Sequence, residues 1–122
     1  MLCLPWPPSN NRYYRHISKG VHAGRTLLSF EGRDYRQAVQ AVVAAQGAQK
    51  PLEGRLAVII HAFPPDARRR DLDNIFKSVL DSLQHAQVYA DDSQIDRLVI
   101  HRCSKIIGGR LDVFVEEIKN EI

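Results

Sequence analysis

The sequence has few cysteines and no long hydrophobic segment. Cys3 and Cys103 are the only cysteines in 122 residues, and no CxxC pair occurs, which argues against a disulfide framework and against a cysteine-rich zinc site. No segment approaches the roughly 20 apolar residues that span a bilayer, and residues 1–5 lack the basic and apolar regions of a signal peptide. We therefore expect a protein of the reducing cytoplasm that does not associate with a membrane.

The chain also has no large excess of charge of one sign. It contains 17 Lys and Arg against 14 Asp and Glu, a formal net charge of +3, which is only a mild bias towards polyanions. The distribution is more informative, because residues 1–36 hold six basic and two acidic side chains, whereas residues 66–96 hold seven Asp and no Glu. Acidic side chains are thus concentrated in the middle of an otherwise basic chain.

Length and hydrophobic pattern predict a single α+β domain over residues 1–122, with a mixed sheet and two main helices. The predicted order is β-α-β-α-β-β, and turn residues and apolar spacing place strands at 2–5, 55–63, 94–102 and 110–118, and helices at 29–47 and 71–85. Residues 6–28 are rich in Pro, Asn and Gly, so they are predicted to form a long loop. Long ordered loops are usually functional, which makes this segment a candidate ligand surface.

Two aspartates stand where the chain passes from a loop into the second helix. In the sequence RRRDLDN, Asp71 and Asp73 are two residues apart, a spacing that directs both side chains to one side of an extended segment. Two carboxylates, with a third from Asp91 or Asp92, would suit magnesium or manganese and leave coordination positions open for phosphate and water. The alternative is that an aspartate here only caps the helix, since Asp is a preferred N-cap residue.

The basic residues beside these aspartates also allow two interpretations. Lys77 follows Asp73 by four residues, so the two side chains either form a weak pair on the helix surface or Lys77 neutralises a phosphate. The arginines at 68–70 form a solvated turn, pair with nearby aspartates, or hold a nucleic-acid backbone.

Four segments of the sequence resemble the RusA family of Holliday junction endonucleases. The similarity extends over essentially the whole chain, and the combination of RRRDLDN with the DD pair is the most specific part. The matching segments are LPWPPSNNRYYRH (4–16), RRRDLDNIFKSVLDSL (68–83), YADDSQI (89–95) and GGRLDV (108–113).

The resemblance implies a magnesium-dependent homodimer, with manganese as a substitute metal and no nucleotide cofactor, that resolves four-way junction DNA by paired nicks. The family's metal-binding aspartates fall on Asp71, Asp73 and Asp92, and its active-site lysine falls on Lys77. Asp91 is left without an assigned role.

The predicted DNA contacts lie around the aspartates and in the basic N-terminal third of the chain. Two other functions are consistent with the same residues: a nuclease that acts on other branched DNA, and a structure-specific DNA-binding protein without catalytic activity. The predicted DNA-binding residues are Arg68, Arg69, Arg70, Asn74, Arg12 and Arg15.

Overall fold

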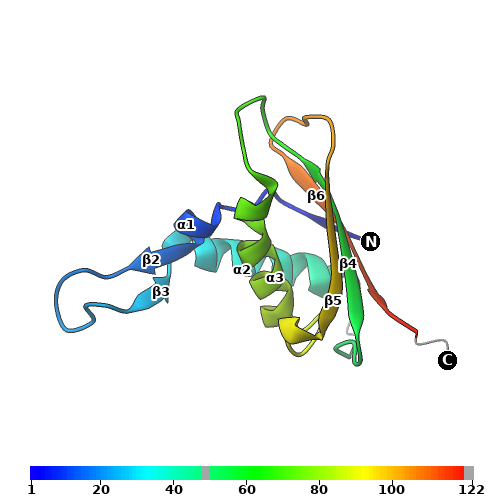
Figure 1. Ribbon diagram of the computed structural model, residues 1–122, viewed down its shortest axis with the longest axis horizontal. Coiled ribbons are helices and arrows are strands. Elements are labelled where there is room, and N and C mark those ends of the chain that lie inside the picture. The colour runs from blue at the N-terminus through cyan, green and yellow to red at the C-terminus, as the bar shows by residue number, and fades with distance from the viewer. Residues whose placement is uncertain (48–49, 120–122) are drawn as a thin grey trace.

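A computed structural model describes residues 1–47 and 50–119 of the chain, so the predicted domain end at residue 122 lies outside the described residues. No helix in the described part is long and apolar enough to cross a bilayer. Figure 1 shows the arrangement of the elements. In chain order they are β1 (Leu2–Leu4), α1 (Asn10–Tyr13), β2 (Tyr14–His16), β3 (Thr26–Leu28), α2 (Phe30–Ala45), β4 (Leu56–Phe63), the 3₁₀ helix η1 (Leu72–Ile75), α3 (Phe76–His85), the 3₁₀ helix η2 (Asp92–Gln94), β5 (Ile95–Arg102) and β6 (Arg110–Glu117).

The main sheet has four strands in the order β1-β6-β4-β5. β4 runs parallel to β5 and antiparallel to β6, with Ile60 opposite Ile100 on one side and Val113 on the other. The parallel pair requires a crossover connection, and α3 provides it. The sheet is therefore mixed, and β1, α2, β4, α3, β5 and β6 confirm the predicted α+β order.

The core lies between this sheet and the two long helices, which occupy the same side of the sheet (Figure 1). On β4, Leu56, Val58 and Ile60 are fully buried, as expected for the central strand of a sheet. On α3, Val79 and Leu83 are also fully buried. Each such side chain contributes about 1.5–3 kcal/mol by leaving water, so packing against the sheet fixes the position of α3.

The helix predicted over residues 71–85 is present, but its first turn is the 3₁₀ helix η1 and the α-helix begins at Phe76. The N–H of Asn74 donates to the carbonyl of Asp71 at 3.2 Å. This hydrogen bond between residues three apart is the one that defines a 3₁₀ turn, which is tighter than a turn of α-helix. This turn carries Asp73 and leads directly into the residues of α3.

The prediction of one long loop over residues 6–28 was wrong, because residues 10–13 form α1 and residues 14–16 and 26–28 form an antiparallel pair of strands. Ser9 caps α1 by accepting a hydrogen bond from the N–H of Arg12, and Arg15 on β2 lies opposite Leu27 on β3. The strands are only three residues long, which is too short for alternation to be recognised in the sequence. The two strands and residues 17–25 between them, named the arm, extend away from the main sheet (Figure 1).

Candidate functional site

Asp71 and Asp73 lie at the start of η1 with exposed side chains, while Leu72 between them packs against the core. Asp71 occupies the N-cap position in an extended conformation, φ −88° and ψ 131°, but its carboxylate accepts no capping hydrogen bond. The capping explanation therefore does not account for this side chain. The two carboxylates remain available at one end of α3.

The aspartates of the chain differ in whether a basic side chain neutralises them. Within residues 1–47 and 50–119, no Lys, Arg or His nitrogen lies within 4.0 Å of the carboxylates of Asp71, Asp73 or Asp92. An exposed carboxylate without a cationic partner can bind a cation without first breaking an ion pair. Four other aspartates are paired, namely Asp66 with Arg70, Asp81 with Arg36, Asp96 with Arg55 and Asp112 with Arg110.

Lys77 is exposed on the first turn of α3. In the described part of the chain its ammonium group forms no ion pair, so the surface pair with Asp73, one of the two interpretations of this lysine, is not formed. Its backbone N–H donates to Oδ1 of Asn10 at 3.2 Å. The ammonium group is thus free to approach an anion beside Asp71 and Asp73.

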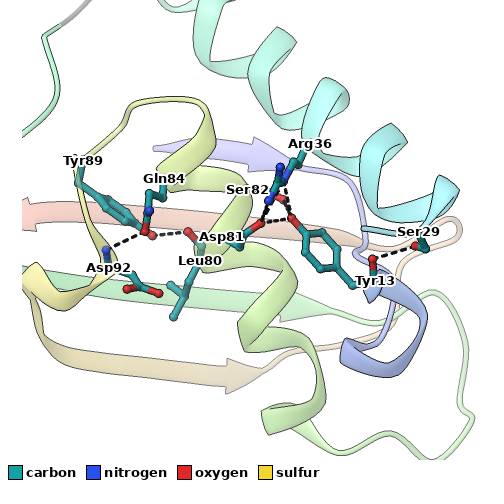
Figure 2. Close-up of polar contacts among 9 residues, drawn as sticks. All are labelled: Tyr13, Ser29, Arg36, Leu80, Asp81, Ser82, Gln84, Tyr89 and Asp92. Atoms are coloured by element: carbon teal, nitrogen blue, oxygen red, sulfur yellow. Dashed lines mark hydrogen bonds and ion pairs between the residues drawn. The ribbon is translucent and has the colours of Figure 1, made fainter. Parts of the chain in front are cut away.

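The DD pair divides into one structural and one free carboxylate. Asp91 caps η2 by accepting from the N–H of Ser93 at 2.8 Å, and Gln94 completes the capping box. This hydrogen bond from the Ser93 backbone lowers the pKa of Asp91. Asp92 is exposed, and its N–H donates to Oε1 of Gln84 at 2.9 Å on the last turn of α3 (Figure 2).

The three predicted metal ligands therefore do not meet within one chain. Asp71 and Asp73 precede the first turn of α3, whereas Asp92 is attached to its last turn. A helix of ten residues is about 15 Å long. Accordingly, no group of three His, Cys, Asp or Glu side chains within the described ranges is placed to hold a metal ion. The oxygen donors at Asp71 and Asp73 suit magnesium chemically, but they form only part of a site.

A groove runs beside Asp71, and the predicted DNA-binding residues Arg12, Asn74 and the arginines at 68–70 contribute to its lining together with residues 6–9. Ile75, which follows Asn74 in the sequence, is buried in the core and also contributes to the lining of the groove. Four arginines thus line the groove together with one carboxylate of the predicted metal site, that of Asp71.

The arginines at 68–70 in the groove have different environments. Arg70 pairs with Asp66 at 2.6 Å and lies over the ring of Trp6, with its guanidinium carbon 5.8 Å from the ring centre. Arg68 lies farther from Asp66, at 3.6 Å. Arg69 is exposed and makes no hydrogen bond or ion pair with any described residue. The internal-pairing interpretation is therefore correct for Arg70, while Arg69 is free to bind a phosphate.

The Arg70 contact also affects the acidity of its partner. The hydrogen bond from Arg70, followed by one from the N–H of Arg68, lowers the pKa of Asp66 to about 2. Asp66 therefore stays ionised at any physiological pH. The pair closes the segment that joins β4 to η1 into a fixed turn just before Asp71.

The remaining predicted DNA contacts are Arg12 and Arg15. Arg12 pairs with Glu31 at 2.9 Å, although both side chains remain largely exposed. Arg15 is exposed on the arm and has no ion-pair partner among the described residues. The arm also carries Lys19 and Arg25 and contains no acidic residue, so it presents positive charge away from the main sheet.

Sequence reasoning did not find the polar contacts that hold α1 in place. Tyr13 is completely buried, and its hydroxyl donates to the carboxylate of Asp81 on α3 (Figure 2). Nε of Arg36 on α2 donates to both the Tyr13 hydroxyl, at 2.9 Å, and Asp81, at 3.0 Å. Burial, and then the hydrogen bond to Asp81, raises the pKa of Tyr13 to about 12. These residues are far apart in the sequence, so no local spacing indicates the network.

Comparison with known proteins gives one consistent result. The family model described as "Endodeoxyribonuclease RusA" matches residues 5–116. Crossover junction endodeoxyribonucleases RusA of Enterobacteria phage 82 and of Escherichia coli K12 are each 39% identical over 120 residues, which cover 98% of this chain and 96% of the relative. The corresponding protein of Enterobacteria phage HK97 is 38% identical over 117 residues, covering 96% of this chain and 93% of its own.

Proposed function

Since the chain belongs to the RusA family, we propose that it is an endodeoxyribonuclease that resolves four-way DNA junctions by paired, symmetric nicks, in recombination and repair. We further propose that nicking requires magnesium, which manganese can replace. The observation that carries the proposal is the pair of exposed, unneutralised carboxylates, Asp71 and Asp73, beside a groove lined by arginines.

The proposed roles follow from where each side chain lies. Asp71 and Asp73 hold the divalent cation, which when bound activates water and stabilises charge on the phosphate. Lys77 lies one turn further along and forms no ion pair with the described residues. It places its ammonium group against the scissile phosphate or the leaving oxygen.

The groove positions the DNA backbone relative to these carboxylates. Arg69 has no partner among residues 1–47 and 50–119, so it binds a neighbouring phosphate without losing a contact to them. Arg70 instead keeps the turn before Asp71 in place through Asp66. Asn74, which lies next to Asp71 in the groove, is placed to contact the same strand. Arg12 and Arg15 extend this surface from α1 onto the arm, and phosphate contacts of this kind orient DNA rather than read its sequence.

We also propose that the active form is a homodimer in which Asp92 of a second copy completes the site at Asp71 and Asp73. Support comes from the position of Asp92 at the far end of α3, where it cannot join the other two carboxylates of its own chain. Two such shared sites, related by two-fold symmetry, suit a junction that must be cut in two symmetric strands.

The function is tested by following nicks in an end-labelled, immobile four-way junction and in linear duplex of the same sequence, with magnesium, with manganese and with a chelator. The proposal predicts paired nicks that appear in the junction only, and only with metal. Equal cutting of linear duplex would refute junction specificity. Tight, salt-sensitive junction binding without product in either metal would instead identify a non-catalytic binding protein.

A further inference from the structure

One asparagine connects the N-terminal part of the chain to the turn that carries the proposed catalytic residues. Nδ2 of Asn10 donates to the backbone carbonyl of Asp73 at 3.3 Å. Oδ1 of the same amide accepts from the N–H of Lys77 at 3.2 Å. A single side chain thus holds the backbone at both ends of the four-residue step from Asp73 to Lys77.

This contact replaces a helix cap that α3 lacks. Ile75 occupies the N-cap position of α3 and has no polar side chain, so no capping hydrogen bond forms there. The N–H of Lys77 is one of the first amides of the helix, which have no partner within it. Asn10 supplies that partner from 67 positions earlier in the sequence.

Asn10 is itself held firmly. Residues 5–9, named the strap, connect β1 to α1, and they are fixed by hydrogen bonds from Tyr35 to the carbonyl of Pro5, at 2.9 Å, and from Ser78 to the carbonyl of Pro8, at 3.0 Å. At the other end of α1, Tyr13 is buried in its network with Arg36 and Asp81. The amide of Asn10 therefore meets the turn from a fixed position.

We propose that Asn10 is a positioning residue for the nuclease site, and that its amide sets the placement of the Asp73 carboxylate relative to the Lys77 ammonium. This inference rests on the proposed function. Asn10 touches neither the reacting phosphate nor the metal in this account; it acts through the backbone of the two residues that do. Partners of this kind typically change metal affinity or activity by about 10- to 100-fold when they are removed.

The test replaces Asn10 with Ala and measures two quantities. Exchange of the Lys77 amide hydrogen, followed by NMR without metal or DNA, is expected to become about tenfold faster, because its hydrogen bond is lost. The magnesium concentration that gives half-maximal junction nicking is expected to rise about tenfold, while junction affinity in chelator stays within twofold. Asn10→Asp keeps a side-chain oxygen that accepts from the N–H of Lys77. It is therefore expected to retain slow exchange of the Lys77 amide hydrogen, which would show that this oxygen protects the amide.

Two control variants separate positioning from general loosening. Asn11→Ala removes an exposed asparagine from the same short helix, and Tyr35→Phe removes the hydroxyl that donates to the carbonyl of Pro5, which releases the strap without removing a contact of the turn from Asp73 to Lys77. Both are expected to leave the magnesium requirement unchanged, even where Tyr35→Phe lowers the melting temperature.

Three results would overturn the inference. The first is unchanged exchange and an unchanged magnesium requirement in Asn10→Ala. The second is an equal rise in that requirement in Tyr35→Phe, because any loosening of the strap would then suffice. The third is a wild-type protein that nicks no junction in any metal, which refutes the proposed function and the positioning role together. In the first two cases wild-type nicking is retained, so the inference alone fails.

Discussion

At the scale of single residues, the proposed ligands share the lack of a counter-ion with Asp34 and Asp91 among the described residues, but Asp71 also lies in the groove lined by arginines. Asp81 and Asp96 each face an arginine that satisfies them. Asp71, Asp73 and Asp92 face none among the described residues. A carboxylate that is left unneutralised close to the DNA path is unfavourable for binding a polyanion, so its presence there is best explained by a cation that it binds.

This explanation predicts the effect of Asp73→Asn. Nicking of the four-way junction is expected to fall by more than about 100-fold, beyond what the loss of an outer partner of a metal site costs. Junction affinity is expected to stay the same or increase, because one negative charge near the phosphates is removed. Gel-shift titration in chelator and nicking in magnesium measure the two effects separately.

Asp34→Asn is the matched control, since Asp34 is exposed on α2 and has no ion pair with any described residue. It is expected to nick at the wild-type rate. Loss of junction binding by a folded Asp73→Asn protein would instead assign Asp73 a structural role.

At the scale of elements, the network around Tyr13 joins α1 to α2 and α3. Tyr13→Phe removes the hydroxyl that donates to Asp81 and accepts from Arg36, and it is expected to lower the free energy of unfolding by about 1.5–3 kcal/mol, as for hydrogen bonds to charged groups. Tyr14→Phe, next to it on β2, is the matched control. Urea denaturation at neutral pH measures both, and equal effects of the two variants would contradict a special role for the network.

The raised pKa of Tyr13 gives the pH dependence of this contribution. Because the folded-state pKa, about 12, exceeds the ordinary value of 10.0, the stabilisation is complete below pH 10 and is lost as pH rises from 10 towards 12. The difference in unfolding free energy between wild type and Tyr13→Phe is therefore expected to shrink only in that alkaline range. A difference that already disappears near pH 8 would contradict the assignment.

The geometry of the turn before Asp71 depends on the ion pair between Asp66 and Arg70. Asp66→Asn removes the partner of Arg70, so the turn is expected to loosen and limited trypsin digestion to cleave faster after the arginines at 68–70. The low pKa of Asp66, about 2, means that the pair is complete above pH 4 and is lost only as pH falls from about 4 towards 2. Unchanged digestion of Asp66→Asn at neutral pH would show that the pair does not hold the turn.

The secondary structure was largely predictable from the sequence where the apolar residues are regularly spaced. It was less predictable where an element is only three or four residues long and depends on a polar contact. Val79 and Leu83 fall on the predicted apolar face and are buried, because tertiary packing and helical period agree there. The arm and α1 were missed, since Ser9 as a cap and the pairing of Arg15 with Leu27 span too few residues to leave a pattern.

The candidate site was predictable in part for a similar reason. The two-residue spacing of Asp71 and Asp73 is a local feature, and both are exposed at the start of η1. The position of Asp92 depends on Gln84 and on the length of α3, and Asn10 reaches its partners across 63 and 67 positions. Such placements follow only from the folded chain.

At the scale of the whole molecule, the proposed dimer assembles each metal site from two copies of the chain. Asp71 and Asp73 lie at one end of α3 and Asp92 lies at the other, so each chain would contribute to two different sites in such a dimer. The two variants Asp73→Asn and Asp92→Asn are each expected to be inactive alone. In a mixed dimer, however, one site would contain the intact Asp71 and Asp73 of one chain and the intact Asp92 of the other.

The most direct measurement is magnesium-dependent nicking of an end-labelled four-way junction by an equimolar mixture of Asp73→Asn and Asp92→Asn, refolded together so that subunits exchange. The account predicts that the mixture recovers single nicks that neither variant makes alone, with a chelator abolishing them. A mixture as inactive as its components, although mass spectrometry shows mixed dimers, would contradict a site that is shared between two chains.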